Sequence, residues 1–507
     1  MSDKIRIRFG NGEVEGKRIE GEAAAFLGIP YAQPPVGELR FQKPKPVKNW
    51  DGVKDCTEFG AHCPYKATHT DRITGSDEDC LYLNVFAPIS NSQVKKNLPV
   101  FVYIHGGGFV MDCSNKLGIE NIGRHLCIKD IIVVTLNYRL GLLGFLCWND
   151  KIKGNFGLYD MKMALEWVVR NISAFGGDPH NITVGGQSAG AVAVDLLSLS
   201  PLTRDLFQNC INFAGTSFCV FATKDQSKIK EFAIDFAKKH LRYQGDGEDD
   251  KVLEILKTAD CRDLAIEGLA NLGPVLDGEF FPKDLDALRE EAPRKNVLTG
   301  VTEYECLTFG IFSQQFPTLK ASVPFFVRLI NETIDVKPAE DLYDKFVDET
   351  LDEKDPEKYK QFTNFLSDLY FNYGTYRMVK HRVERGEDVY QFRFTYFKEG
   401  TNGSYASLIP FQGASHCLEL PYLFGISYID EGEFEPDEND KIMIDYFSGY
   451  LINFIKNGNP NDEKLNGWEK VTKENLAGHM CFDLEPKMHN VGLYSSQLHE
   501  LDAFFKQ

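Results

Sequence analysis

The chain has 507 residues, of which 43% are hydrophobic and 26% are charged. This composition is typical of a globular protein with a sizeable core, and it excludes small disulfide scaffolds and disordered chains. The net charge of −18 at pH 7 would repel the phosphates of nucleic acids and of anionic membranes, so we expect neither as a partner.

The N-terminal sequence MSDKIRIRF alternates charged and apolar residues and lacks the apolar stretch and cleavage site of a secretory signal. No stretch reaches the roughly 18 uncharged apolar residues that a membrane-spanning helix needs, so no transmembrane segment is predicted. We therefore expect a cytoplasmic protein whose 12 cysteines are mostly buried thiols.

Short β-branched and aromatic runs, which are typical of buried strands, recur along the chain and are separated by amphipathic stretches. Strands are predicted, in chain order, at residues 98–104, 131–138, 182–185, 210–213, 297–301, 389–394 and 480–484.

Helices are predicted between these strands. In the helix at 158–175, Leu158, Met161 and Leu165 share one face, and the sequence Gly-Gly-Asp-Pro at 176–179 ends the helix. The regions 222–290 and 310–385 are mostly helical, for example at 226–240 and 359–385. Strands separated by helices indicate a mainly parallel α/β sheet flanked by helices. No repeat or linker marks a boundary, so residues 1–507 are predicted to form a single domain.

The pentapeptide Gly186-Gln187-Ser188-Ala189-Gly190 lies between the predicted strand 182–185 and a helix-like stretch at 191–199. A serine at the tip of a sharp strand-to-helix turn occupies strained backbone, and small neighbours let the chain pass close to it. This context favours a nucleophilic serine. The alternative is an ordinary glycine turn in which Ser188 caps the helix.

A second glycine-rich segment, His105-Gly106-Gly107-Gly108-Phe109, follows the predicted strand 98–104. Backbone amides with no side chain in the way can converge on a developing oxyanion. Phosphate binding is the rival use of such a loop, but neither a P-loop Lys-Ser/Thr nor a dinucleotide-binding G-x-G-x-x-G follows. Together with the serine motif, the loop makes acyl transfer the leading chemistry.

A nucleophilic serine needs a histidine base and a carboxylate that orients this base. Spacing alone does not choose among the six histidines after Ser188, although His416 lies in a loop of small residues, where catalytic histidines are common. Glu303 and Glu305 both follow the predicted strand 297–301, at the edge where parallel strands carry their sites; a surface salt bridge is the alternative role for either. The six histidines are His240, His381, His416, His479, His489 and His499.

Together with further motifs along the chain, the two glycine segments make the sequence resemble the type-B carboxylesterase and cholinesterase family of α/β-hydrolases. The resemblance covers nearly the whole length of the chain. The order and spacing of the motifs make this resemblance specific. Besides the two glycine segments, the matching stretches are residues 28–32, 39–41, 78–85, 137–141, 154–160, 175–179, 300–305 and 413–425.

The resemblance implies an α/β-hydrolase fold with helical insertions over the active site. It gives the roles of nucleophile, acid and base to Ser188, Glu305 and His416, in that order. It also gives an oxyanion hole formed by the backbone amides of Gly107, Gly108 and Ala189. The family needs no metal or cofactor for this chemistry, so none is expected.

The resemblance further implies structural pairs. Arg40 with Glu78 and Arg139 with Asp160 would form buried ion pairs, and Cys63 with Cys80 matches the family's first disulfide. In a reducing cytosol we expect this disulfide to stay open. Four N-x-Ser/Thr sequons should then carry no glycan: Asn171, Asn181, Asn331 and Asn402.

Two departures from the cholinesterase pattern narrow the substrate. Gln187 replaces the glutamate that precedes the serine in cholinesterases, and no Trp lies between Cys63 and Cys80. The apparatus that binds choline is therefore missing, and the Gln-Ser pair also resembles juvenile-hormone esterases and invertebrate gut esterases.

The sequence thus predicts a serine hydrolase that cleaves small neutral carboxylic esters through an acyl-enzyme. One alternative is a catalytically silent, neuroligin-like adhesion relative, although such proteins lose triad residues and gain a transmembrane segment. Another is a specialised lipid or hormone esterase, which only the lining of the pocket would distinguish.

Overall fold

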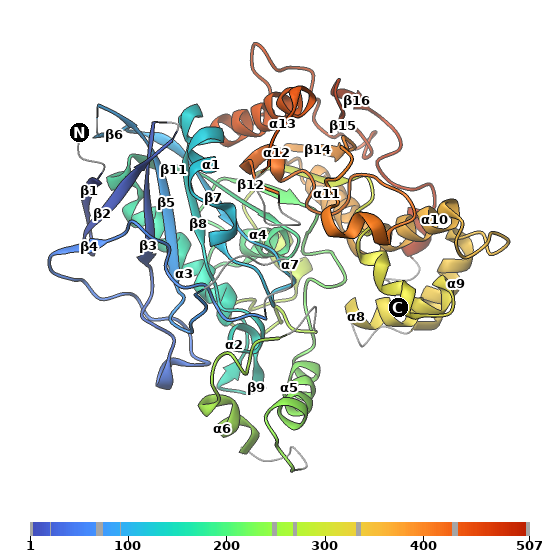
Figure 1. The fold of residues 1–507 in the computed structure, drawn as a ribbon, viewed down its shortest axis with the longest axis horizontal. Coiled ribbons are helices and arrows are strands. Elements are labelled where there is room, and N and C mark those ends of the chain that lie inside the picture. Colours follow the sequence, from blue (N-terminus) through green and yellow to red (C-terminus); the bar gives the residue numbers. More distant parts are fainter. Residues whose placement is uncertain are drawn as a thin grey trace. The chain divides into compact units, whose positions relative to one another are not determined.

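The computed structural model describes residues 4–20, 22–66, 75–91, 93–245, 251–266, 271–330, 336–427 and 434–502 (Figure 1). The chain forms two compact units. The first unit comprises Met1–Cys210 and Thr223–Pro293, and the second comprises Ile211–Ala222 and Arg294–Gln507. A single domain over the whole chain stays a prediction.

The first unit contains a mixed sheet whose strands follow the order β1-β2-β3-β5-β8-β7-β11. Strand β7 is parallel to both of its neighbours, β8 and β11, whereas β1, β2, β3 and β5 pair antiparallel. The strands of this unit are β1 (Lys4–Phe9), β2 (Gly12–Ile19), β3 (Ala23–Pro30), β4 (Val53–Asp55), β5 (Tyr82–Ser90), β6 (Gln93–Val94), β7 (Leu98–Ile104), β8 (Ile132–Leu136), β9 (Cys147–Asn149), β10 (Ile152–Lys153) and β11 (Gly177–Gln187).

Helices of the first unit follow the predicted pattern closely. The predicted helix 158–175 is α3 followed by a 3₁₀ turn at Ile172–Phe175, and the prediction 226–240 coincides with α5. The side chain of Asp225 caps α5 by accepting from the amides of Ser227 and Lys228. The helices are α1 (Glu120–His125), α2 (Gly141–Phe145), α3 (Phe156–Asn171), α4 (Ala189–Leu199), α5 (Gln226–His240), α6 (Lys251–Thr258) and α7 (Leu285–Glu291).

In the second unit, three parallel strands, β13, β14 and β15, are followed by the antiparallel β16. The last three residues of β12 belong to this unit, and Thr299 Oγ1 of β13 donates a hydrogen bond to the carbonyl oxygen of Asn212. The strands are β12 (Asn209–Phe213), β13 (Asn296–Thr302), β14 (Val389–Phe394), β15 (His479–Phe482) and β16 (Lys487–His489). Both units therefore have the parallel strands expected of an α/β fold.

Helices of the second unit differ from the prediction at one point. The predicted helix 359–385 is two α-helices joined by a π-helical turn at Asp368–Asn372, which adds a residue to the turn without breaking the helical path. Phe326, Phe362 and Phe365 belong to the apolar core of these helices. The helices are α8 (Leu319–Ile330), α9 (Val336–Phe346), α10 (Pro356–Ser367), α11 (Tyr373–Glu384), α12 (Pro421–Phe424) and α13 (Glu438–Asn457).

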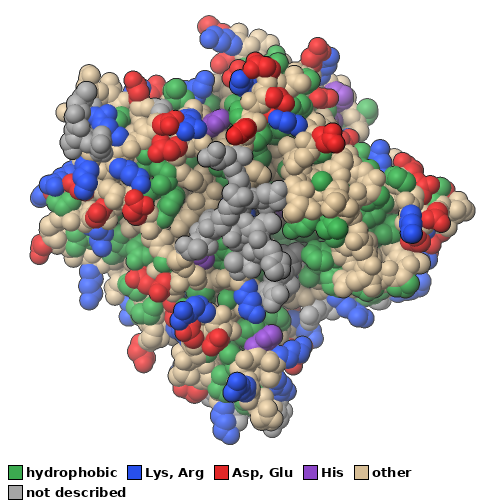
Figure 2. Space-filling view, in the orientation of Figure 1, with side chains coloured by type: hydrophobic (Ala, Val, Ile, Leu, Met, Phe, Trp, Pro, Cys, Tyr) green, Lys and Arg blue, Asp and Glu red, His purple; other side chains and the backbone are tan. Residues whose placement is uncertain are grey.

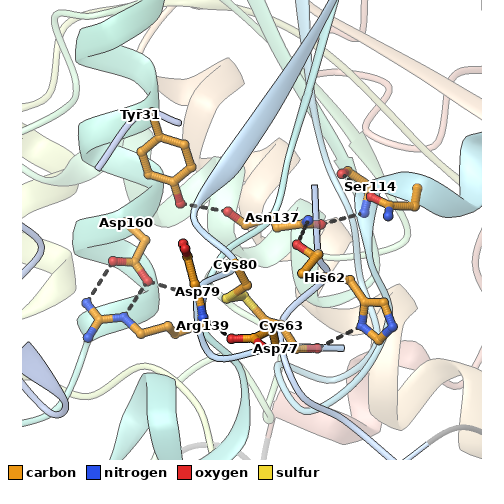
Figure 3. The surroundings of a disulfide bond; sticks show 12 residues. Tyr31, His62, Cys63, Asp77, Asp79, Cys80, Ser114, Asn137, Arg139 and Asp160 are labelled. Carbon is orange, nitrogen blue, oxygen red and sulfur yellow. Dashed lines mark hydrogen bonds and ion pairs between the residues drawn. A yellow bond between two sulfur atoms is a disulfide. The ribbon is translucent and has the colours of Figure 1, made fainter. Parts of the chain in front are cut away.

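The structure contains a disulfide between Cys63 and Cys80, so the expectation that this bridge stays open is wrong (Figure 3). The two Cα atoms lie 4.9 Å apart, within the range that a disulfide spans without backbone movement. The expectation came from the inferred compartment, which says nothing about this geometry. The other ten cysteines are thiols and eight of them are buried, as predicted. A cytoplasmic location stays a prediction.

Both implied buried ion pairs are present in the first unit. Arg139 binds Asp160 through two nitrogens, at 2.8 and 2.7 Å, and both side chains are almost fully buried (Figure 3). Arg40 binds Glu78 in the same bidentate way and also donates to three carbonyl oxygens at the end of α6, those of Leu256, Lys257 and Ala259. These charges hold segments together that lie far apart in the sequence.

Most other ion pairs lie at the surface. On the face drawn in Figure 2, Lys and Arg side chains are interspersed with Asp and Glu side chains. Exposed pairs such as Arg262 with Asp260 are screened by water and salt, and they add little stability. Across the described ranges, no helix combines the length and apolar character needed to cross a membrane.

We predict that Arg139→Ala lowers the free energy of unfolding by about 3–5 kcal/mol, because it leaves Asp160 charged and buried without its partner. Chemical denaturation measures this change. Arg262→Ala, which removes an exposed partner of Asp260, is the control and should leave the transition nearly unmoved. Equal losses in the two variants would contradict a structural role for the buried pair.

Candidate active site

Ser188 forms the tip of the turn that joins β11 to α4. Its backbone angles, φ 56° and ψ −123°, are strained for a residue with a side chain. The Ser188 side chain makes no capping hydrogen bond to α4, which argues against the helix-cap alternative. The residue is partly exposed. The local geometry is thus that of a serine presented by its backbone rather than one used to start a helix.

The backbone at the end of β7 lies so close to the serine motif that positions 186 and 190 must be glycine. A Cβ atom on Gly190 would lie 2.2 Å from the carbonyl oxygen of Ile104 and 2.6 Å from that of His105. A Cβ atom on Gly186 would lie 2.8 Å from the Ile104 oxygen and 2.6 Å from the carbonyl carbon of Gly190. Any side chain at either position would push the turn away from the strand.

The glycine loop after β7 packs directly against this turn. A Cβ atom on Gly106 would lie 2.5 Å from Gln187 Oε1 and 3.2 Å from Ser188 Cβ. Gly107 and Gly108 have φ angles of 81° and 61°, a region that favours glycine. The structure therefore brings the predicted amide donors, on Gly107, Gly108 and Ala189, into adjacent segments of one unit.

Two aromatic rings fix the start of the loop. The ring of His105 stacks on that of Tyr138 at 4.4 Å, and the Tyr138 hydroxyl lies 3.0 Å from the His105 carbonyl oxygen and 3.1 Å from that of Gly106. Burial lowers the pKa of His105 to about 4, so its imidazole is neutral at physiological pH.

Glu305 and His416 meet in the second unit. The Nδ1 atom of His416 lies 2.5 Å from Glu305 Oε2, and the Glu305 side chain is fully buried. The other oxygen, Oε1, accepts a 2.6 Å hydrogen bond from the amide of Thr302 at the end of β13. The carboxylate is therefore fixed on both sides, which is what the orienting acid of a triad requires.

The rival acid and the rival histidines have other surroundings. Glu303 is partly exposed and faces Arg393 at 3.6 Å, which is the salt-bridge role. His479 is buried against the carbonyl oxygen of Ala477, and His499 is exposed beside Glu500. His416 pairs with a fully buried carboxylate, whereas the carboxylate beside His499 is partly exposed.

The loop that carries His416 is held by backbone and side-chain hydrogen bonds. The amide of Tyr304 donates to the carbonyl oxygen of Ala414 at 2.9 Å. Asn402 Nδ2 donates to the carbonyl oxygen of Gly413, and Asn402 Oδ1 accepts from the Ser415 hydroxyl at 3.0 Å. Asn402 is fully buried, so its sequon cannot accept a glycan in the folded protein. Asn331 lies outside the described residues.

Aromatic side chains pack on the His416 ring. Phe371, in the π-helical turn, has its ring centre 4.7 Å from that of the imidazole, and Phe309 has its centre at 5.5 Å. Phe221 packs edge-on against Phe371 at 5.5 Å. The surroundings of the imidazole in this unit are therefore largely apolar.

A second carboxyl lies close to the pair. Glu419, three residues after His416, is buried, and this burial together with the negative charge of Glu305 raises its pKa well above the usual range. Protonated Glu419 can sit near Glu305 without opposing its negative charge. Asn402, Phe371 and Glu419 were not predicted as site residues. Asn402 and Phe371 reach the histidine loop only in the folded chain, and the sequence alone does not show that the Glu419 side chain is buried.

The described residues contain no group of three or more His, Cys, Asp or Glu side chains that could hold a metal ion. The first unit carries a strained serine on a strand-to-helix turn with a glycine loop beside it, and the second unit carries a histidine bonded to a buried glutamate. With parallel strands in each unit, these features are those of an α/β-hydrolase.

Comparisons with known proteins agree. A model of the carboxylesterase family matches residues 2–499, and the chain belongs to this family. Esterase cest-33 of Caenorhabditis elegans is 38% identical, over 90% of this chain and 85% of its own. Gut esterase 1 of Caenorhabditis briggsae is 30% identical over 96% and 90%, and para-nitrobenzyl esterase of Bacillus subtilis is 32% identical over 92% and 93%. The protein is a carboxylic-ester hydrolase.

We predict that Glu305→Gln lowers kcat by about 10⁴-fold, the effect expected when a triad acid becomes an amide. Glu303→Gln is the matched control, two residues away and at the surface, and it should keep nearly normal turnover. Steady-state hydrolysis of an aryl acetate measures both. The opposite ranking would exchange the roles of the two glutamates.

Proposed function

We propose that Ser188 is the nucleophile, His416 the general base and Glu305 the orienting acid of a hydrolase for neutral carboxylic esters. The observation that carries this proposal is the hydrogen bond of His416 Nδ1 to buried Glu305. This bond leaves Nε2 as the basic nitrogen of the imidazole, and it stabilises the imidazolium that forms when Nε2 takes a proton.

In the first step, Ser188 Oγ attacks the ester carbonyl carbon and its proton passes to His416 Nε2. The carbonyl oxygen becomes an oxyanion, which the backbone amides of Gly107, Gly108 and Ala189 stabilise. The tetrahedral intermediate then breaks its bond to the alkoxy group. The leaving alcohol takes the proton from His416, and the acyl group stays on Ser188.

A water molecule completes the cycle. It attacks the acyl carbon while His416 takes one of its protons, and the second tetrahedral intermediate releases the carboxylic acid. The same proton returns from His416 to Ser188 Oγ. Apart from this water, the groups that act in the cycle are side chains and backbone amides of the chain itself, and no step needs an electron donor or acceptor.

The surroundings of the candidate residues support neutral substrates. Gln187, which precedes the serine, carries no charge, and Phe221, Phe309 and Phe371 make an apolar environment around His416 in the second unit. Relatives named gut esterase and juvenile hormone esterase support an enzyme rather than a silent adhesion protein. The retained serine, glutamate and histidine support the same choice.

We predict that Ser188→Ala abolishes ester hydrolysis and leaves the thermal transition almost unchanged, because the hydroxyl contributes chemistry and little packing. An organophosphate probe followed by peptide mapping should label Ser188 in the unaltered protein. Labelling of another residue, or turnover retained in the variant, would contradict the assignment of the nucleophile.

A second prediction concerns the charge of the substrate. A quaternary ammonium group needs an aromatic face and nearby negative charge, and each cation–π contact contributes on the order of 0.5–2 kcal/mol. Gln187 stands where cholinesterases have the carboxylate beside the serine, and no Trp lies between Cys63 and Cys80. Uncharged acetyl esters should therefore have a higher kcat/KM than acetylthiocholine. Gln187→Glu is a useful comparison, since it restores the carboxylate next to the serine. Equal or better turnover of acetylthiocholine by the unaltered enzyme would favour a cholinesterase.

A further inference from the structure

Tyr138 lies just beyond the end of β8, beside the glycine loop that follows β7. The two strands are parallel and in register, with Ile104 opposite Leu136. Two residues after Leu136, the Tyr138 ring therefore comes level with the loop and stacks on His105. The side chain is fully buried, so its hydroxyl must find its hydrogen-bond partners inside the protein.

These partners are two successive carbonyl oxygens of the loop. The Tyr138 hydroxyl lies 3.0 Å from the oxygen of His105 and 3.1 Å from that of Gly106, and its single proton is shared between them. Burial, with the charge of Asp112 as a smaller cause, raises the pKa of Tyr138 well above its usual value. The hydroxyl thus remains a donor at every pH at which the enzyme works.

The direction of one carbonyl fixes the direction of the next amide. In a planar trans peptide, the C=O bond of one residue and the N–H bond of the following residue point in opposite directions, and no peptide bond among the described residues is cis. With the Gly106 oxygen turned toward Tyr138, the Gly107 N–H must point away from Tyr138.

The next peptide of the loop is fixed in an analogous way by the backbone. The carbonyl oxygen of Gly107 accepts hydrogen bonds of 3.0 Å from the amides of both Val110 and Met111, so the Gly108 N–H points away from that turn. The Gly107 amide is therefore oriented through the Gly106 carbonyl, and the Gly108 amide through the Gly107 carbonyl. Of these two carbonyls, that of Gly106 is held by a side chain, the hydroxyl of Tyr138.

We propose that Tyr138 is a positioning residue that aims the Gly107 amide at the oxyanion of the ester transition state. This role rests on the proposed function, because it takes the Gly107 amide to be an oxyanion donor. Glycine at 106 and 107 lets the loop backbone adopt more conformations than other residues would allow. An amide can be preorganised for the oxyanion only if this conformational freedom is restricted. The hydrogen bonds of the Tyr138 hydroxyl restrict it from outside the loop.

Tyr138→Phe is the informative variant, because it removes the hydroxyl and keeps the ring that stacks on His105. Tyr450→Phe is the matched control. Tyr450 is also a buried tyrosine, in α13 of the second unit, and its hydroxyl donates at 2.9 Å to the carbonyl oxygen of Asn466, which is outside the glycine loop and away from Tyr138 in the chain. Both variants lose one buried hydroxyl, so a general loss of stability should affect them alike.

The experiment compares ester turnover with the binding of an aryl trifluoromethyl ketone. Ser188 Oγ adds to the carbonyl carbon of this ketone, and the proton of the serine hydroxyl passes to His416. The ketone oxygen then becomes an oxyanion at the place where the transition state has one. We expect Tyr138→Phe to lower kcat and the affinity for the ketone together, each by about 10- to 100-fold, with KM for the ester nearly unchanged. Tyr450→Phe should change neither by more than a few-fold.

Two results would overturn this inference. If Tyr138→Phe and Tyr450→Phe lose kcat and ketone affinity equally, the Tyr138 hydroxyl contributes only stability. If Tyr138→Phe raises KM and leaves kcat and ketone affinity unchanged, the hydroxyl acts on ester binding rather than on the oxyanion. Ser188→Ala separates these failures from that of the proposed function, since retained reaction of that variant with the ketone would refute the nucleophile itself.

Discussion

The close backbone contact between the end of β7 and the turn after β11 is the constraint on which the serine half of the site depends. The carbonyl oxygens of Ile104 and His105 lie so near the backbone of Gly190 that no side chain larger than a hydrogen atom fits at this position. This contact joins the glycine loop to the serine turn, because the loop is the direct continuation of the strand. The strain at Ser188 persists because the surrounding backbone is held in place.

Three consecutive residues after β8 extend this constraint into the rest of the first unit. Asn137 accepts from the amide of Ser114, and Arg139 binds Asp160 (Figure 3). Asn137 also donates to the carbonyl oxygen of Ala61, and Tyr138 binds the glycine loop. The segment that follows β8 thus holds the region of the disulfide, the glycine loop and α3 together. Polar groups at such a junction are buried, so each must be matched by a partner.

Local features of the fold could be predicted from the sequence, and non-local ones mostly could not. Strands β7 and β14 and helix α5 begin and end where the pattern of apolar and capping residues predicts. The π-helical turn escaped prediction, since its side chains continue the apolar pattern of the helices on either side. The disulfide was wrongly expected to be open, because the expectation rested on the inferred compartment and not on the distance between the cysteines.

The candidate site shows the same limit. Glu305 and His416 are 111 residues apart, and only a family resemblance selected this pair over Glu303 and the other histidines. Asn402 looked like a sequon, and its burial against the His416 loop depends on tertiary contacts.

The π-helical turn at Asp368–Asn372 has a consequence for how this region can vary. An α-helix advances about 100° per residue, so an additional residue in a regular helix would rotate everything that follows by that angle. Phe371 lies within the turn and faces the imidazole, whereas α11 follows it. The π turn accommodates this additional residue locally, so α10 and α11 keep the faces of a continuous α-helix that lacks it. Loss of one residue here would therefore leave a regular α-helical turn and keep the two helices in phase, but it would remove the bulge in which Phe371 lies.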